Sequence, residues 1–126
     1  MPKGDLLIAE DDPILRQLYQ RKFSLEGYQI RTANDGEEAV KLLTEQLPSL
    51  LVLDINMPKM DGFQVLELLP KEKRTFPVIM LSNLADDRTL ARSKELGADG
   101  FLVKKDMTIK GLLELVEKLI TLRKPQ

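Results

Sequence analysis

The sequence predicts an α/β domain in which a parallel sheet of five strands is covered by helices on both faces. Short apolar runs alternate with stretches of helical spacing along the whole chain. Strands that alternate with helices in this way are joined by right-handed crossovers, which make them parallel. Two of the runs are apolar without alternation, as expected for central strands that are buried on both sides. The predicted strands are Leu6–Ala9, Gln29–Ala33, Leu50–Leu53, Val78–Leu81 and Phe101–Val103.

Apolar residues at helical spacing predict one helix after each strand. The predicted core-facing stripes of the first two are Ile14, Leu15, Leu18 and Leu25, and Ala39, Val40, Leu42, Leu43 and Leu47. A short third helix carries Val65, Leu66, Leu68 and Leu69; the fourth is a weak, polar helix over Leu84–Leu96; and the fifth carries Ile109, Leu112, Leu113, Val116 and Ile120. Three further leucines widen the last stripe, namely Leu115, Leu119 and Leu122. They indicate either a broad core face or a partner surface.

Residues that favour helix ends agree with these boundaries. Gly27 and Gly97 follow the first and fourth helices, where a C-terminal cap is expected. Asp35, with Glu38 three residues later, is typical of a helix N-terminus. Pro48 is predicted to end the second helix.

Length and composition predict a single domain over residues 1–126, with its sheet and helices at roughly 5–122. The net charge of -1 predicts no attraction to nucleic acid. No apolar stretch approaches the roughly 20 residues that span a bilayer, so we expect a cytoplasmic protein without membrane attachment. The chain contains neither Cys nor His, which excludes thiolate chemistry and the usual general base. Any chemistry must therefore depend on carboxylates, hydroxyls, lysines and a hard metal ion.

Polar side chains follow four of the predicted strands. They are Glu10 and Asp11, Asp54 and Asn56, Ser82 and Asn83, and Lys104 and Lys105. Ligands of an open parallel sheet bind beyond the carboxyl ends of its strands, so we expect these groups to converge. The carboxylates repel one another unless a cation such as Mg²⁺ neutralises them. Beside that ion Asp54 could act as a nucleophile toward a phosphoryl group, with Lys104 and Ser82 supplying charge neutralisation and positioning.

Four segments in this order resemble the response-regulator receiver domain, the phosphoacceptor module of two-component signalling. They are Leu7–Pro13, Leu53–Gly62, Ile79–Asn83 and Gly97–Lys104, and each lies at the end of a predicted strand. The resemblance covers essentially the whole chain. It implies the flavodoxin-like, doubly wound fold with strand order 2-1-3-4-5 and five helices.

The resemblance also implies an acceptor and a metal site. Asp54 would be the phosphorylated aspartate, and it would bind Mg²⁺ together with its neighbours. Asp11 would be a direct metal ligand, Glu10 would act largely through water, and Asn56 would provide its backbone carbonyl.

Three further residues take roles from the same resemblance. Lys104 would pair with the phosphoryl group, Ser82 would donate a hydrogen bond to it, and Phe101 would be an aromatic switch that follows that hydroxyl. The implied function is a signalling switch rather than an enzyme. Its implied partners are a sensor histidine kinase or a histidine phosphotransfer protein as donor, and a downstream protein target. The target, or a second copy in a homodimer, would bind at the fourth and fifth helices.

Three positions depart from the family pattern. Lys105 stands where a proline is usual, so we expect a trans peptide bond after Lys104, because a non-proline cis bond costs roughly 2.5–4 kcal/mol. Asn83 replaces a small residue, which bears on the size of the phosphoryl entrance. Glu10 replaces the more frequent aspartate and adds reach without changing charge.

Simpler explanations exist for several of these residues. Asp54 could be a solvated strand end, and Asp12 before Pro13 is typical of a helix N-cap rather than a ligand. The Ser82 hydroxyl could satisfy a nearby backbone group, and Phe101 could be an ordinary core residue.

Two rival functions remain at this point. One is a small Mg²⁺-dependent phosphatase with an aspartyl nucleophile, in which a second Asp would be the acid/base. That position is Asn56 here, which cannot transfer protons. The other is a degenerate receiver that binds partners without phosphorylation, against which the complete charged set argues.

Overall fold

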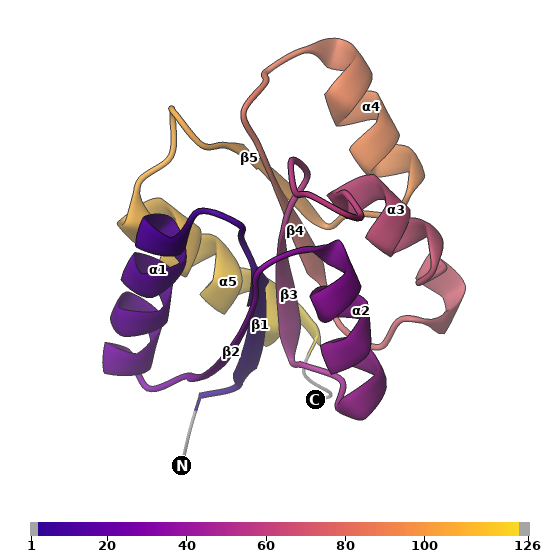
Figure 1. The fold of residues 1–126 in the computed structure, drawn as a ribbon. Coiled ribbons are helices and arrows are strands. Elements are labelled where there is room, and N and C mark those ends of the chain that lie inside the picture. Colours follow the sequence, from indigo (N-terminus) through magenta and orange to yellow (C-terminus); the bar gives the residue numbers. More distant parts are fainter. Residues whose placement is uncertain (1–2, 124–126) are drawn as a thin grey trace.

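The structure is a computed structural model that describes residues 3–123, so residues 1–2 and 124–126 of the predicted domain lie outside the described part. Its centre is a five-stranded sheet in the order β2-β1-β3-β4-β5 (Figure 1). Every neighbouring pair of strands is parallel, which confirms the predicted topology. The strands are β1 (Asp5–Ala9), β2 (Gln29–Ala33), β3 (Leu50–Asp54), β4 (Val78–Ser82) and β5 (Gly100–Val103).

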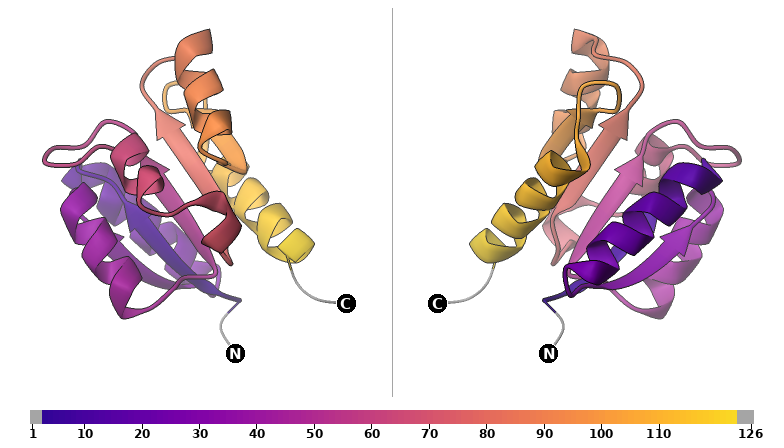
Figure 2. Two further views of the ribbon diagram at one scale, coloured as in Figure 1. Left: turned by 90° about the vertical axis from the view of Figure 1, so that its right-hand side faces the viewer. Right: turned by 90° about the vertical axis from the view of Figure 1, so that its left-hand side faces the viewer.

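Five α-helices cover the two faces of this sheet. They are α1 (Pro13–Leu25), α2 (Gly36–Glu45), α3 (Gly62–Glu67), α4 (Asp87–Glu95) and α5 (Ile109–Arg123). A short 3₁₀ turn, η1 (Lys71–Lys73), precedes β4. Helices α1 and α5 lie on one face, and α2, α3 and α4 lie on the other (Figures 1 and 2). This is the predicted doubly wound arrangement.

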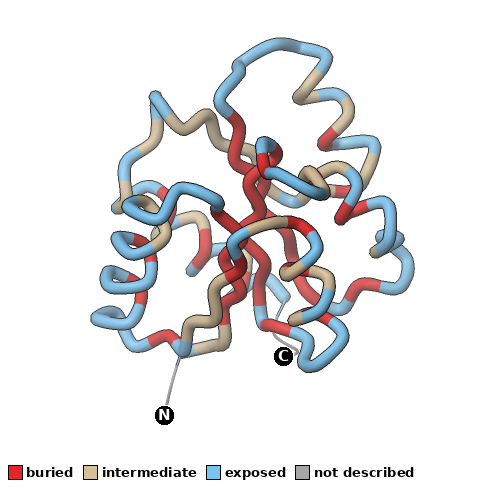
Figure 3. The backbone as a smooth tube through the Cα atoms, in the orientation of Figure 1, coloured by how far each residue is buried: buried red, intermediate tan, exposed pale blue. Residues whose placement is uncertain are grey.

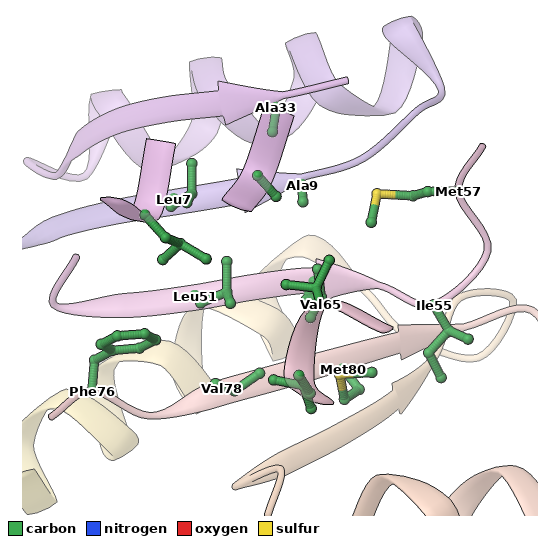
Figure 4. Close-up of a cluster of buried hydrophobic side chains, with 14 residues drawn as sticks. Leu7, Ala9, Ala33, Leu51, Ile55, Met57, Val65, Phe76, Val78 and Met80 are labelled. Carbon is green, nitrogen blue, oxygen red and sulfur yellow. The ribbon is translucent and has the colours of Figure 1, made fainter. Parts of the chain in front are cut away.

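The core consists of two layers, because neighbouring residues of a strand point to opposite faces of the sheet. In Figure 3 the buried segments run through the middle of the molecule. Leu7, Leu51 and Val78 belong to the layer under α2 and α3, which Figure 4 shows in close-up. Leu6 and Leu50 belong to the layer under α1 and α5. All residues of β3 and β4 are buried, as the non-alternating apolar runs predict.

Helix α1 faces the sheet with a different side from the one predicted. Tyr19 and Phe23 are buried, whereas Ile14, Leu18 and Leu25 are 76%, 39% and 75% exposed. The predicted stripe was therefore wrong except for Leu15, which packs at the margin of the core. The two aromatic rings fill the space above the sheet, and three aliphatic side chains remain on the outer side of the helix.

The other helices follow the predicted stripes more closely, with corrections at their ends. In α5, Leu112, Val116 and Ile120 are buried. Leu115 and Leu119 pack against the same layer, which favours the broad core face. Three leucines that the prediction had placed in a core-facing stripe or left open are exposed, namely Leu47, Leu68 and Leu122.

Two helix boundaries also differ from the sequence prediction. Helix α2 ends at Glu45, so Pro48 lies beyond its end and does not terminate it directly. Helix α4 begins at Asp87 rather than Leu84, because the Asp86 side chain accepts a hydrogen bond from the backbone N–H of Thr89 and caps it.

The predicted caps are confirmed. Gly27 and Gly97 have φ angles of 99° and 85°, the left-handed conformation that ends a helix at low cost in glycine. The Asp12 side chain accepts hydrogen bonds from the backbone N–H groups of Ile14 and Leu15, so it caps α1. Asp35 caps α2 by accepting from Glu38 N at 2.8 Å.

Candidate phosphoacceptor and metal site

The strand register brings the predicted site residues to one edge of the sheet. Ala9 pairs with Leu53, so Glu10 lies beside Asp54 where β1 and β3 end. On the other side of β3, Asp54 pairs with Leu81 of β4. The loops that follow the strands all emerge at this edge (Figure 1). A parallel sheet thus collects in space residues that are far apart in the chain.

Lys104 joins the two buried carboxylates of the site. Its Nζ donates to Asp54 Oδ2 at 2.6 Å and to Glu10 Oε2 at 3.0 Å, and it lies 2.8 Å from Glu10 Oε1. The side chains of Asp54 and Glu10 are 0% exposed, and that of Lys104 is 15% exposed. The other Asp54 oxygen, Oδ1, accepts a hydrogen bond from Asn56 N at 3.0 Å. One ammonium group is therefore shared between two desolvated carboxylates, which leaves an excess of negative charge when both are ionised.

The electrostatics follow from this crowding. Burial raises the pKa of Glu10 to about 7; the Lys104 hydrogen bond opposes this rise and the neighbouring Asp54 adds to it. Burial lowers the pKa of Lys104, but its hydrogen bonds to Asp54 and Glu10 outweigh that effect, and the pKa lies above its ordinary value. Lys104 is therefore a permanent cation, while Glu10 carries a proton part of the time near neutral pH.

The donor set fits a hard divalent cation. Carboxylate oxygens of Glu10, Asp11 and Asp54 lie within 4.8 Å of one another. Glu10 Oε1 is buried and lies 2.8 Å from Lys104 Nζ, but within residues 3–123 it accepts no hydrogen bond of acceptable geometry. Asp11 is exposed at the mouth of the site, where a partly hydrated ion can be reached. Oxygen ligands that leave room for several waters are what Mg²⁺ prefers, and a second positive charge would offset the excess of carboxylates.

A cleft of about 660 Å³ opens beside these carboxylates, between the loop after β3 and the loop after β4. Asp11, Asn56 and Ser82 contribute polar groups to its wall, and Met57 and Leu84 contribute apolar ones.

The structure places the remaining predicted residues as follows. Ser82 is buried at the end of β4, but its hydroxyl donates to Leu84 O at 2.9 Å and accepts from Leu84 N at 3.0 Å. The hydroxyl thus satisfies the backbone of the β4–α4 loop and makes no hydrogen bond to Asp54. Phe101 is half-buried in β5 and lies beside a small cavity of about 100 Å³ against α4. Asn83 N donates to Asn56 Oδ1 over a long distance of 3.5 Å.

The peptide bond between Lys104 and Lys105 is trans, as predicted from the absence of proline. Lys105 is exposed, so only the first of the two lysines points into the site. No helix within residues 3–123 is long and apolar enough to cross a membrane.

Sequence reasoning missed several residues that shape the site. Arg16 Nη1 donates to the carbonyl oxygens of Glu10 at 2.9 Å and Asp11 at 3.4 Å, so it holds the acidic loop onto α1. No sequence signal identifies this contact. The capping box of Asp61 and Gln64 fixes the start of α3, and its Asp-x-x-Gln spacing was visible in the sequence.

Tyr19 was also missed, because the predicted α1 stripe excluded it. It is buried on the inner side of α1, and its hydroxyl has no hydrogen-bond partner within residues 3–123. Burial, followed by the negative charge of Glu10, raises its pKa to about 12. The Tyr19 hydroxyl is therefore neutral at physiological pH.

Comparisons with known proteins agree with this geometry. The sequence profile of the response regulator receiver domain matches residues 6–117. A probable transcriptional regulator, ycf27 of Porphyridium aerugineum, is 36% identical over 124 residues, which cover 94% of this chain. This chain spans 51% of the length of that relative.

Solved structures show the same relationship. The receiver domain of the Francisella response regulator 1452 superimposes with a TM-score of 0.90 at 31% identity, covering 97% of this chain and all of the other. The signal receiver domain of a histidine kinase from Syntrophus aciditrophicus gives 0.87 at 35% identity and covers 98% and 94% of the two chains. This chain therefore belongs to the response-regulator receiver family, the signalling domains of two-component regulators.

Proposed function

We propose that this domain is a Mg²⁺-dependent phosphoacceptor that receives its phosphoryl group on Asp54. The observation that carries the proposal is the position of Asp54, which is buried at the carboxyl end of β3 and paired with Lys104 at 2.6 Å, next to a cleft lined by Asp11, Asn56 and Ser82. Glu10 and Asp11 complete a carboxylate set that fits Mg²⁺, and the Asn56 backbone carbonyl is the further ligand that we assign.

Residues 1–126 contain no histidine, so we assign the donor to a phosphohistidine outside this domain. We assign this role to a sensor histidine kinase or a histidine phosphotransfer protein. The exposed apolar side of α1, with Ile14 and Leu18, begins next to the acidic loop and offers a contact for such a protein.

In the transfer step an Asp54 oxygen forms a bond to phosphorus. The bond between phosphorus and the donor's imidazole nitrogen breaks, its electron pair stays on that nitrogen, and water supplies the nitrogen with a proton. The Lys104 ammonium group stabilises the negative charge first on the Asp54 carboxylate and then on the phosphoryl oxygens. Bound Mg²⁺ would supply the remaining neutralisation between the like-charged groups. Asn56 cannot act as an acid or base, so we expect no turnover of external phosphomonoesters.

The dianionic phosphoryl group on Asp54 would shift the balance between two conformations of the region around β4 and β5. The Ser82 hydroxyl exchanges its hydrogen bonds with Leu84 for one to the phosphoryl group, which draws the β4–α4 loop inward. Phe101 lies next to a cavity of about 100 Å³ and so has room to change rotamer. The surface of α4, β5 and α5 is then the site for a downstream protein target or a second copy of the chain. With a net charge of -1, we expect this domain not to bind nucleic acid directly.

Intact-mass measurement after incubation with Mg²⁺ and a small acyl phosphate tests the proposal. We expect a single added phosphoryl group on the wild type, none without Mg²⁺, and none on Asp54→Ala. Asp106→Asn is a matched control, because Asp106 is an exposed acidic residue near the same edge, and it should be labelled like the wild type. An adduct on Asp54→Ala, or no adduct on the wild type, would overturn the assignment.

A further inference from the structure

The loop between β3 and α3, residues 55–61, carries the Asn56 carbonyl that we assign to the metal. The loop is closed at its base, where Gly62 N donates to Ile55 O at 2.9 Å. A Cβ atom on Gly62 would lie 2.7 Å from Asp54 O, so the end of the loop packs directly on the β3 backbone. At the base, therefore, the loop has little freedom to move.

The apex of the same loop has an unusual backbone conformation. Lys59 has a φ angle of 68° and is the non-glycine residue within the described range that has a positive φ. Met60 N donates to Pro58 O at 2.7 Å, which closes a three-residue γ-turn around Lys59. An L-residue holds this conformation only where the surroundings enforce it.

Gly36, the first residue of α2, provides that enforcement. A Cβ atom placed on Gly36 would lie 1.9 Å from the carbonyl oxygen of Met60 and 2.7 Å from its Cβ, so the two backbones are in contact. Its φ is not positive, so the requirement for glycine is one of space alone. Next to it, Asp35 Oδ2 lies 3.7 Å from Lys59 Nζ and adds an attraction to the same contact.

We infer that Gly36 is a positioning residue for the metal site, because its contact with Met60 fixes the apex of the β3–α3 loop and thereby the Asn56 carbonyl. Pro58 has a locked φ and the γ-turn adds a hydrogen bond, so residues 58–60 move as one unit. If this unit is displaced, the change must be taken up by the dihedral angles of Asn56 and Met57. This inference rests on the proposed Mg²⁺ site and deepens it.

Calorimetric titration with magnesium chloride alone tests the inference on the folded protein, without any phosphodonor. We expect Gly36→Ala to weaken Mg²⁺ binding about tenfold or more, the range found when groups that orient metal ligands are removed. Val116→Ala is the control for general destabilisation, since it truncates a buried side chain in the layer under α1 and α5. It should lower the urea midpoint and leave Mg²⁺ affinity unchanged.

A second pair of variants approaches the same contact from the loop side, in case Gly36→Ala does not fold. Lys59→Pro forbids the positive φ and should weaken Mg²⁺ binding to a similar degree. Lys59→Gly also removes the ammonium group but permits the conformation, so it should keep the wild-type affinity.

Wild-type Mg²⁺ affinity in both Gly36→Ala and Lys59→Pro would overturn this inference alone. A wild-type protein that binds no Mg²⁺ would overturn the proposed metal site together with it.

Discussion

Replacing Lys104 with methionine removes the cation that serves both buried carboxylates and keeps a side chain of similar length. Within residues 3–123, Lys104 is the basic residue that pairs with Asp54 and Glu10, at 2.6 and 2.8 Å. In the absence of Mg²⁺, the Lys104→Met variant must therefore bury two carboxylates without a counter-charge or neutralise one of them.

The size of the effect follows from the burial of the three groups. Removing one partner of a buried ion pair costs about 3–5 kcal/mol of unfolding free energy. The lower end of this range applies, because the Lys104 side chain is 15% exposed and Glu10 can take up a proton. We expect a loss of about 3 kcal/mol at about pH 8. The loss should be smaller at about pH 5.5, because Glu10 is already protonated there in the wild type and no longer needs the ammonium group.

Urea unfolding followed by far-ultraviolet circular dichroism measures this loss, because urea leaves the ionic strength low and the chain contains no tryptophan. Lys105→Met is the matched control: Lys105 is exposed, and its stability change should stay within about 0.5 kcal/mol. Added Mg²⁺ should restore part of the stability lost in Lys104→Met. Equal stability of Lys104→Met and wild type at about pH 8 without Mg²⁺, or a loss that does not depend on pH, would refute the reasoning.

Three further outcomes are expected. Without Mg²⁺, the unfolding free energy of the wild type should fall as pH rises from about 4.5 to about 7, because the folded protein holds the Glu10 proton more tightly than the unfolded chain does. Urea titrations of Glu10→Gln should lack this decrease. If the decrease persists in that variant, it belongs to another group. Ile14→Ser changes a residue that is 76% exposed, so labelling by a small acyl phosphate should be unchanged while transfer from a phosphorylated histidine partner slows. Equal transfer rates from that partner to the variant and the wild type would exclude the α1 surface as the contact for the donor. Gly97→Ala should destabilise the fold by about 1–2 kcal/mol, because φ is 85° and the new Cβ would lie 2.5 Å from Arg74 Nη2. Gly111→Ala, at an exposed helical position, is the control in the same urea assay. Equal urea midpoints for the two variants would contradict the proposed strain at Gly97.

The order and type of the elements could be predicted because they depend on local patterns. The apolar run Leu50–Leu53 has no polar residue and is short, which is typical of a strand buried on both faces. Asp12 has a side chain that can cap a helix N-terminus, and Gly27 lacks a side chain and so adopts the positive φ that follows a helix C-terminus. Both properties are independent of the rest of the fold.

The inner side of α1 could not be predicted in the same way. Leu18 and Tyr19 are both apolar enough to be buried, and they lie on different sides of the helix. Which one packs inward depends on the orientation of the helix axis over the sheet and on the volume to be filled there. Neither quantity is a property of the α1 segment alone.

For the candidate site, the sequence by itself determined which chemical groups follow each strand, since strand ends are set by residues a few positions apart. The tertiary structure decided which of these groups touch. Lys104 meets Glu10 and Asp54 across 94 and 50 positions of chain, whereas Ser82 turns its hydroxyl to Leu84 only two residues away. It also decided the pKa of Glu10 and the contact of Gly36 with Met60, because desolvation and close approach are produced by packed neighbours and not by the residue that experiences them.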